Sequence, residues 1–325
     1  MKKRVMDLTI FDIDFIDRGG AEALIPVEEA NQIIQGVITS SAVLSSGRKL
    51  ANMTARQYKM PVLDSLPIAY FVDGDTGTKQ TTKMAWDKKV ITAEEIAVIV
   101  PIPEAVLDDS QYDIWGEVKP RIVEAFGKKI DGAILFGVDK PASWRDDIVK
   151  TVTSAGATVN LTDDLYNSIM GEDGVIAKVE NSGYVPNGHM ADISLRAKLR
   201  GIKDTTGQPI FKQDMQSGTS YSLDGSRMNF PINGAFDKSK ALMISGDFSQ
   251  LVYSIRQDIT FKLFTEGVIQ DPATKEIVYN LMQNDMVALR AVMRLGWELP
   301  NPINSLQKDK TKRCPFAILK GGAAE

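Results

Sequence analysis

Residues 112–137, with the sequence YDIWGEVKPRIVEAFGKKIDGAILFG, carry the strongest helical pattern of the chain. Their apolar members recur three and four positions apart, so in an α-helix they would form one continuous face. That face comprises Trp115, Val118, Ile122, Phe126, Ile130 and either Ala133 or Ile134. At ~1.5 Å per residue the helix would be ~37 Å long and would end at Gly137. Pro120 predicts either a kink or the true first turn of this helix.

Two extended patterns and a turn precede this helix. Residues 48–63 alternate as in a strand, and Pro61 marks that strand as an edge or exposed strand. Residues 73–78 have turn chemistry, and residues 90–102 form a second extended run. Two arms of ~12 residues at ~3.3 Å per residue predict a hairpin that reaches ~40 Å. Such a hairpin either projects onto another subunit or folds back over its own core, and the sequence is compatible with both.

The other elements place helices early and strands late, which indicates an α+β fold. A first helix is expected from Pro26 to a stop at Gly47. A second runs from Thr162, as its N-cap, to Ala177 with an interruption around 171–174, and a third covers 192–202. The expected strands are 241–245, 251–258, 259–264 and 285–297.

Length, composition and charge exclude several classes of protein. The 325 residues, 43% hydrophobic and 25% charged, are typical of a folded, soluble chain with two or three substructures. The 38 Lys and Arg against 42 Asp and Glu give a net charge of −4, so no overall basic field attracts nucleic acid or a membrane surface. Apolar stretches such as 96–102 are far shorter than the ~18 residues of a membrane helix. Acidic residues at 7–17 interrupt any signal peptide, and we expect the protein to stay in the cytoplasm.

The sequence contains no P-loop, G-x-G-x-x-G, G-x-S-x-G or H-E-x-x-H motif. The single cysteine, Cys314, and the single histidine, His189, exclude an intrachain disulfide and a Cys/His zinc cluster. A distant Ser or Cys nucleophile paired with His189 is conceivable, although Asn187-Gly188 predicts a loop at that position.

Three pairs of acidic residues could hold a hard cation, but each lies beside an expected helix start, where carboxylates are favoured in any case. These pairs are Asp108-Asp109, Asp146-Asp147 and Asp163-Asp164. The basic stretch 308–313 is interpreted as a solvated loop before a last strand. We predict that the protein is not an enzyme and has no catalytic residue, no cofactor and no metal.

The order of these segments resembles the major capsid proteins of tailed bacteriophages, which have the Hong Kong 97-type fold. The resemblance covers nearly the whole chain, and the ordered set of segments is what makes it specific. It rests on the N-terminal arm, the polar hairpin, Ile102-Pro-Glu-Ala-Val-Leu-Asp-Asp-Ser110 before the long helix, Asp131-Gly-Ala-Ile-Leu-Phe-Gly137 at its end, Ile244-Ser-Gly-Asp-Phe-Ser249 and the segment 195–211.

The resemblance implies a division of the chain. The hairpin would be the E-loop, which in that family lies over a neighbouring subunit. The long helix would be the spine helix of the peripheral or P domain, and the central part would be the axial or A domain. The implied limits are 1–47 for the N-terminal arm and first helix, 48–100 for the E-loop and its flanks, 101–147 for the P domain with the spine helix, 148–260 for the A domain, 261–311 for the P-domain strands and 312–325 for a C-terminal strand that returns to the A domain.

The implied function is self-assembly, as hexamers and pentamers, into an icosahedral shell that encloses double-stranded phage DNA. The implied partners are other copies of the chain, the portal, a scaffold or decoration protein where one is used, and packaged DNA held without sequence-specific binding; no membrane is involved. The protein would be built into the virion after assembly in the host cytoplasm. Only about two dozen residues precede Pro26, so the resemblance implies a separate scaffold or none.

The resemblance also suggests which residues contact neighbouring subunits. The contact candidates are Phe11 and Phe15 in the arm and Asp75, Lys79, Lys83 and Trp86 in the hairpin. Two other functions stay open at this point. One is an encapsulin-like nanocompartment that encloses a cargo enzyme in the same fold. The other is an enzyme with a dispersed active site, and only the three acidic pairs support that reading.

Overall fold

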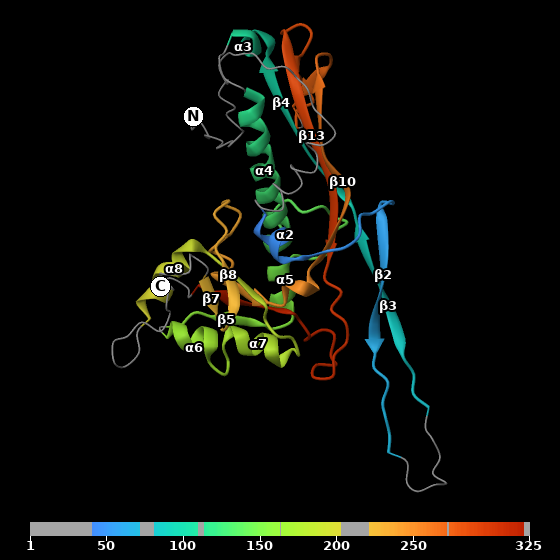
Figure 1. The fold of residues 1–325 in the computed structure, drawn as a ribbon, viewed down its shortest axis with the longest axis vertical. Coiled ribbons are helices and arrows are strands. Elements are labelled where there is room, and N and C mark those ends of the chain that lie inside the picture. Colours follow the sequence, from blue (N-terminus) through green and yellow to red (C-terminus); the bar gives the residue numbers. More distant parts are fainter. Residues whose placement is uncertain are drawn as a thin grey trace, which may run out of the picture. The chain divides into compact units, whose positions relative to one another are not determined.

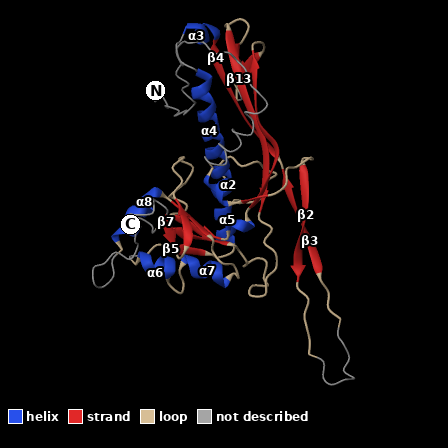
Figure 2. Cartoon of the chain, viewed as in Figure 1, coloured by secondary structure: helices blue, strands red, loops and turns tan. Residues whose placement is uncertain are grey.

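Helices and strands are mixed along the computed structural model in the way that an α+β fold requires (Figure 1; Figure 2). The structure describes residues 41–71, 81–109, 114–162, 164–202, 221–271 and 273–321. The expected helix from Pro26 and the turn at 73–78 therefore lie outside the described residues, apart from 41–47.

The chain divides into two compact units. Among the described residues, the first unit contains 96–109, 114–122, 259–271 and 273–293. The second unit contains 41–71, 81–95, 123–162, 164–202, 221–258 and 294–321. The finer domain limits implied by the family resemblance stay predictions.

Helix α4, Ile114–Phe136, confirms the helix expected from the apolar stripe. Trp115, Ile122, Phe126 and Ile130 are all buried, so the predicted face is the packed face. Pro120 lies inside the helix, which continues through it. The helix ends as predicted: Gly137 adopts a φ of +68°, a conformation that strains any residue with a Cβ.

Four strands form a sheet in the order β1-β10-β13-β4. Their bounds are β1 Arg48–Lys49, β4 Glu94–Pro103, β10 Val252–Phe264 and β13 Met286–Glu298. β13 confirms the strand expected at 285–297. The two strands expected at 251–258 and 259–264 are instead one continuous strand, β10, because the chain makes no turn at Asp258 and Ile259.

The first unit has a small core of its own. Its members are Leu281, Met286 and Ala288, with Phe264, Ile269 and Tyr279 packed against them. Strands β11, Val268–Gln270, and β12, Ile277–Asn280, form an antiparallel pair beside it. The short helix α3, Glu104–Asp109, was not predicted from the sequence; its first N–H donates to the Asp285 carbonyl at 2.8 Å.

The second unit is built on a six-stranded mixed sheet in the order β5-β14-β9-β6-β8-β7. The strands are β5 Thr158–Asn160, β6 Gly188–Ala191, β7 Tyr221–Leu223, β8 Ser226–Asn229, β9 Met243–Gly246 and β14 Phe316–Lys320. β9 pairs antiparallel with both β14 and β6. β14 is the last strand expected after the basic stretch, whereas β5 to β8 are too short to give a periodic signal.

Among the described residues, the second unit also contains α5 Ile148–Ser154, α6 Leu165–Met170, α7 Val175–Asn181 and α8 Ile193–Gly201. Helix α7 contacts β14, β9 and β5. The interrupted helix expected at 162–177 corresponds to α6 and α7, and the one at 192–202 to α8. The N-cap of α6 is Asp164 and not Thr162, because the Asp164 carboxylate accepts from the Asn167 N–H.

The expected hairpin exists with different limits. Its arms are β2, Gln57–Ser65, and β3, Ala85–Thr92, so each paired arm spans only ~30 Å at ~3.3 Å per residue. The predicted second arm, 90–102, was wrong because the extended run breaks at Ala93. The Ala93 N–H donates to the Arg56 carbonyl at 2.9 Å, and the chain then continues as β4 in the four-stranded sheet.

Candidate subunit interface

The hairpin is a two-stranded ribbon with little core of its own. Its register places Gln57 opposite Thr92 and Leu63 opposite Trp86. Val62 is the one buried residue of β2, and Ile91 is the one buried residue of β3. A two-stranded hairpin is marginally stable alone in water, so this one needs contacts from outside the ribbon.

Large apolar side chains are exposed on the part of the hairpin at and beyond the end of its ladder, where Ser65 faces Ala85. We call this set the apolar end of the hairpin: Ile68, Tyr70, Phe71, Met84 and Trp86. Phe71 is fully exposed and Trp86 is 66% exposed. A concentration of exposed apolar residues on one element marks a surface that another protein covers.

The opposite end of the hairpin, its root, packs into the second unit. Met53, Ile91, Ala93 and Val252 form a buried cluster, against which Leu50 and Met60 pack. The Trp144 indole Nε1–H donates to the Thr92 carbonyl at 3.1 Å. The root is therefore fixed, whereas the large side chains of the apolar end are exposed.

Polar contacts at the root centre on Glu94. Its carboxylate accepts from the Ser143 hydroxyl at 2.7 Å and forms an ion pair with Arg56 at 3.1 Å. The Ser143 hydrogen bond, followed by the Arg56 hydrogen bond, holds the pKa of Glu94 below its ordinary value. Glu94 thus stays ionised and joins the start of β4 to the segment before β2.

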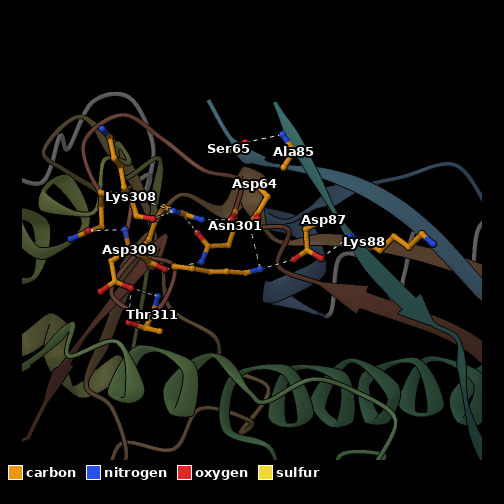
Figure 3. Close-up of polar contacts among 12 residues, drawn as sticks. Asp64, Ser65, Ala85, Asp87, Lys88, Asn301, Lys308, Asp309 and Thr311 are labelled. Carbon is orange, nitrogen blue, oxygen red and sulfur yellow. Dashed lines mark hydrogen bonds and ion pairs between the residues drawn. The ribbon is translucent and has the colours of Figure 1, made fainter. Parts of the chain in front are cut away.

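Near the apolar end of the hairpin ladder, one lysine from the C-terminal part of the chain reaches both strands. Lys310 Nζ lies 2.6 Å from Asp87 Oδ2 on β3 and 3.7 Å from Asp64 Oδ1 on β2 (Figure 3). The Lys310 hydrogen bond lowers the pKa of Asp87, and the same bond raises the pKa of Lys310. The Ile303 N–H also donates to the Leu63 carbonyl at 3.1 Å.

The loop that carries Lys310 is held by a buried arginine. Arg313 is 3% exposed and donates to the side-chain and backbone oxygens of Asn301, each at 3.1 Å. It also donates to the carbonyl oxygens of Gln307 and Lys308. Asp309 accepts from the N–H and hydroxyl of Thr311, as Figure 3 shows. The prediction of a solvated loop at 308–313 was therefore wrong for Arg313, which the sequence could not place inside.

A second buried polar cluster fixes the start of α2, Ala42–Ser46, against α4. The fully buried carboxylate of Asp131 accepts from the Ser41 hydroxyl at 2.5 Å and from the Ala42 and Val43 N–H groups at 3.0 and 3.2 Å. It also accepts from the Asn233 amide at 2.7 Å. Burial raises the pKa of Asp131 against the opposing effect of these hydrogen bonds.

The contact candidates are only partly placed. Lys83 and Trp86 are both exposed, just before and within β3. Asp75 and Lys79 fall in 72–80, and Phe11 and Phe15 in 1–40, all outside the described residues.

Sequence reasoning missed Asp64, Asp87 and Lys310, whose grouping joins residues 223 positions apart. The only sequence feature that pointed to this grouping was the basic stretch 308–313, which has no helical period.

The catalytic candidate His189 lies in β6 and not in a loop, because its segment pairs with both β8 and β9. Its Nδ1 lies 2.9 Å from Ser245 Oγ and its Nε2 lies 3.1 Å from the Leu223 carbonyl. His189 is 1% exposed and Ser245 is fully buried, so a substrate has no access to this pair. Burial also lowers the pKa of His189, and we interpret the pair as a core hydrogen bond.

The acidic pairs cap helices in two of the three cases. Asp147 is the N-cap of α5 and Asp164 is the N-cap of α6, whereas Asp108 and Asp109 end α3. Over the described residues, no three His, Cys, Asp or Glu side chains are grouped so as to bind a metal ion. No helix in the described part of the chain has the length and apolar character needed to cross a membrane.

Comparison with known proteins gives consistent results over most of the chain. A model described as the phage capsid family matches residues 21–307. The major capsid protein of Staphylococcus phage 80alpha is 28% identical over 276 residues, which are 83% of this chain and 79% of that protein. A solved structure from Microbacterium phage Oxtober96 is 34% identical with a TM-score of 0.74, over 86% of this chain and 91% of that one. A structure from Mycobacterium phage Adephagia is 30% identical with a TM-score of 0.75, over 88% of this chain and 91% of that one.

Proposed function

This chain belongs to the phage capsid family, and from that premise we propose that it assembles as hexamers and pentamers into an icosahedral shell around double-stranded phage DNA. The relatives confirm two predictions, namely the function as a phage major capsid protein and the Hong Kong 97-type fold. The same relatives do not support the encapsulin-like alternative. A capsid is built from many copies of one chain, so the interfaces between copies are its functional sites.

The exposed apolar end of the hairpin is the observation that carries this proposal. Burying one large apolar side chain stabilises a complex by ~1.5 to 3 kcal/mol, so covering Phe71 and Trp86 would favour association. The root and Lys310 fix the hairpin to its own subunit, which leaves the apolar end to contact a neighbouring copy. We assign the hairpin this role, as the E-loop of the predicted domain division.

The remaining parts of the proposal concern partners and location. The net charge of −4 suits an enclosing wall that lets packaged DNA move, because many strong phosphate contacts per subunit would immobilise it. We propose that the chain is not an enzyme, that it enters the virion after assembly in the host cytoplasm, and that its other partners are the portal and any scaffold or decoration protein.

A shortened hairpin tests the proposal. Replacing residues 66–84 by Asn-Gly would join Ser65 to Ala85, which already face each other, through a two-residue turn. We expect a soluble, folded subunit with nearly unchanged thermal melting and no closed shells in negative-stain micrographs. The control is Lys59→Ser, which changes an exposed residue of β2 and should leave shells intact. Closed shells of normal size from the shortened chain would contradict the proposal.

A further inference from the structure

The sequence contains two Asn-Gly pairs, Asn187-Gly188 and Asn233-Gly234. Asn-Gly is the dipeptide at which asparagine loses its amide group most readily, because glycine has no side chain to hinder attack of its backbone nitrogen on the asparagine Cγ. The two pairs lie in different surroundings, and this difference decides which of them reacts in the folded subunit.

Asn187-Gly188 is held in the six-stranded sheet of the second unit. Gly188 is the first residue of β6, which pairs with β8 on one side and β9 on the other. The Asn187 side chain is also fixed: its Nδ2–H donates to Asp247 at 2.7 Å, and its Oδ1 accepts from the Phe248 N–H at 2.8 Å. Reaction at this pair requires the start of β6 to leave the sheet, so we expect it to be slow.

Asn233-Gly234 lies outside any strand, in the segment 230–242 between β8 and β9, and Gly234 is exposed. The Asn233 Oδ1 accepts from the Ala235 N–H at 3.1 Å, which polarises the side-chain carbonyl and closes a hydrogen-bonded ring that contains the Gly234 nitrogen. Lys128 Nζ lies 3.6 Å from the position that a Cβ on Gly234 would occupy, and this positive charge favours loss of the Gly234 amide proton. The second pair is therefore the reactive one.

The Asn233 side chain also takes part in the anchor of α2. Its Nδ2–H donates to Asp131 Oδ2 at 2.7 Å, and the same oxygen accepts from the Ala42 N–H at 3.0 Å. The other Asp131 oxygen accepts from the Ser41 hydroxyl at 2.5 Å. Asn233 and the start of α2 thus share one buried carboxylate on α4.

We propose that Asn233 is a site of spontaneous deamidation, and that its deamidation releases α2 from α4. The Gly234 nitrogen attacks the Asn233 Cγ and forms a C–N bond. The Cγ–Nδ2 bond then breaks, and the amide nitrogen leaves as ammonia with the proton that the Gly234 N–H loses. Water opens the resulting succinimide at either of its two carbonyl carbons and leaves aspartate or isoaspartate at position 233. Water is the only reagent that this reaction consumes.

The product places a carboxylate where Asn233 had a hydrogen-bond donor to Asp131. Two carboxylates in direct contact cannot both stay ionised, so one of them takes up a proton or moves away. Asp131 is the one more readily protonated, because burial already raises its pKa. A neutral carboxyl group accepts more weakly from the N–H groups of α2. Because the reaction proceeds with time alone, it sets a lifetime for the anchored form of the subunit.

Isotope labelling tests the modification on the purified full chain. The protein is kept in water enriched in 18O, and both Asn-Gly pairs are followed by peptide mapping and mass spectrometry. We expect 18O to enter position 233, as aspartate and isoaspartate, at least tenfold faster than position 187. Equal rates at the two pairs would overturn the inference, as would an Asn233 that takes up no 18O.

Hydrogen exchange tests the consequence for α2. The deamidated and intact fractions of the aged wild-type chain differ by one negative charge and can be separated by ion exchange. We expect amide exchange at 41–47 to be at least tenfold faster in the deamidated fraction. This comparison gives a result whether or not a substituted chain folds. Unchanged exchange at 41–47 after deamidation would overturn the inference.

Two matched substitutions repeat the measurement without ageing. Asn233→Asp should reproduce the faster exchange at 41–47. Asn187→Asp is the control, because it places the same carboxylate opposite another aspartate, Asp247, and Asp247 does not contribute to the α2 anchor. The control should leave exchange in α2 within twofold of wild type. Equal effects of the two substitutions on α2 would contradict a specific role for Asn233.

Discussion

Lys310 and Asp87 are 223 positions apart in the sequence, yet the lysine Nζ lies 2.6 Å from the carboxylate Oδ2. This ion pair joins the loop before the last strand to β3 beside Trp86, and Asp64 on the other arm lies within reach of the same ammonium group. The direction of the hairpin is therefore set by the C-terminal part of the same subunit.

The Lys310 contact predicts the effect of removing one cation. Lys310→Met should leave the subunit folded but increase amide hydrogen exchange in β2 and β3 and lower the yield of closed shells severalfold. Lys312→Met, on an exposed neighbour, is the control. Because pairing lowers the pKa of Asp87, the wild-type contact is present above pH 3.8 and is lost as the pH falls through the folded pKa. Unchanged exchange in the hairpin of the Lys310 variant would argue against this anchor.

Polar substitutions at the apolar end should separate folding from assembly. Phe71→Ser and Trp86→Ser remove exposed surface, so the melting temperature of the unassembled subunit should change by no more than about 2 °C, as expected for surface changes. Shell formation, followed by light scattering and electron microscopy, should decrease strongly in each. Lys88→Ser, an exposed residue between the two ends of β3, should assemble normally. A Trp86→Ser subunit that misfolds would place this side chain in the intrachain core.

The buried face of α4 should behave in the opposite way. Phe126 is 2% exposed, so Phe126→Ala creates a cavity that costs ~3 to 5 kcal/mol. The variant should lose solubility before it shows any specific assembly defect. Chemical denaturation of the soluble fraction would measure the decrease in its free energy of unfolding. Lys128→Ala, on the exposed side of the same helix, is the control. A stable Phe126→Ala subunit that merely fails to assemble would mean that this face is an interface.

The single histidine makes one pH effect attributable to one residue. Burial lowers the pKa of His189 below 6.5, so the unfolded chain binds a proton more readily than the folded one. The contribution of His189 to stability is therefore present above pH 6.5 and decreases as the pH falls below 6.5 toward the folded pKa. Urea unfolding of the unassembled subunit between pH 7 and 5 should show this slope, and His189→Gln should reduce it. Equal slopes in both proteins would contradict the buried, neutral state.

Local patterns predicted the elements whose signal lies within one segment. The stripe from Trp115 to Ile130 requires nothing beyond the helical period, and α4 follows it closely. The hairpin was predicted with the wrong second arm, because an extended run looks the same on both sides of Ala93 while the pairing partner changes from β2 to β13.

The interface was harder to predict than the fold. Lys310 and Arg313 occur in one basic stretch, yet one forms ion pairs at the hairpin and the other is buried among carbonyl oxygens. Charge alone does not distinguish these environments, because the partners come from distant segments. Trp86 was identified as a contact candidate from its place in a polar hairpin, and its exposure is consistent with that prediction.

Pro61 has a consequence for the fate of newly made subunits. It lies inside the β2 ladder opposite Lys88, and a proline in such a strand faces its nitrogen toward the unpaired edge. That edge therefore lacks one donor, and Lys59 places a charge nearby. Both features hinder open strands of different copies from joining edge to edge into fibrous aggregates. At the high subunit concentrations that shell production requires, this protection from aggregation keeps the exposed hairpin available for packing against neighbouring subunits.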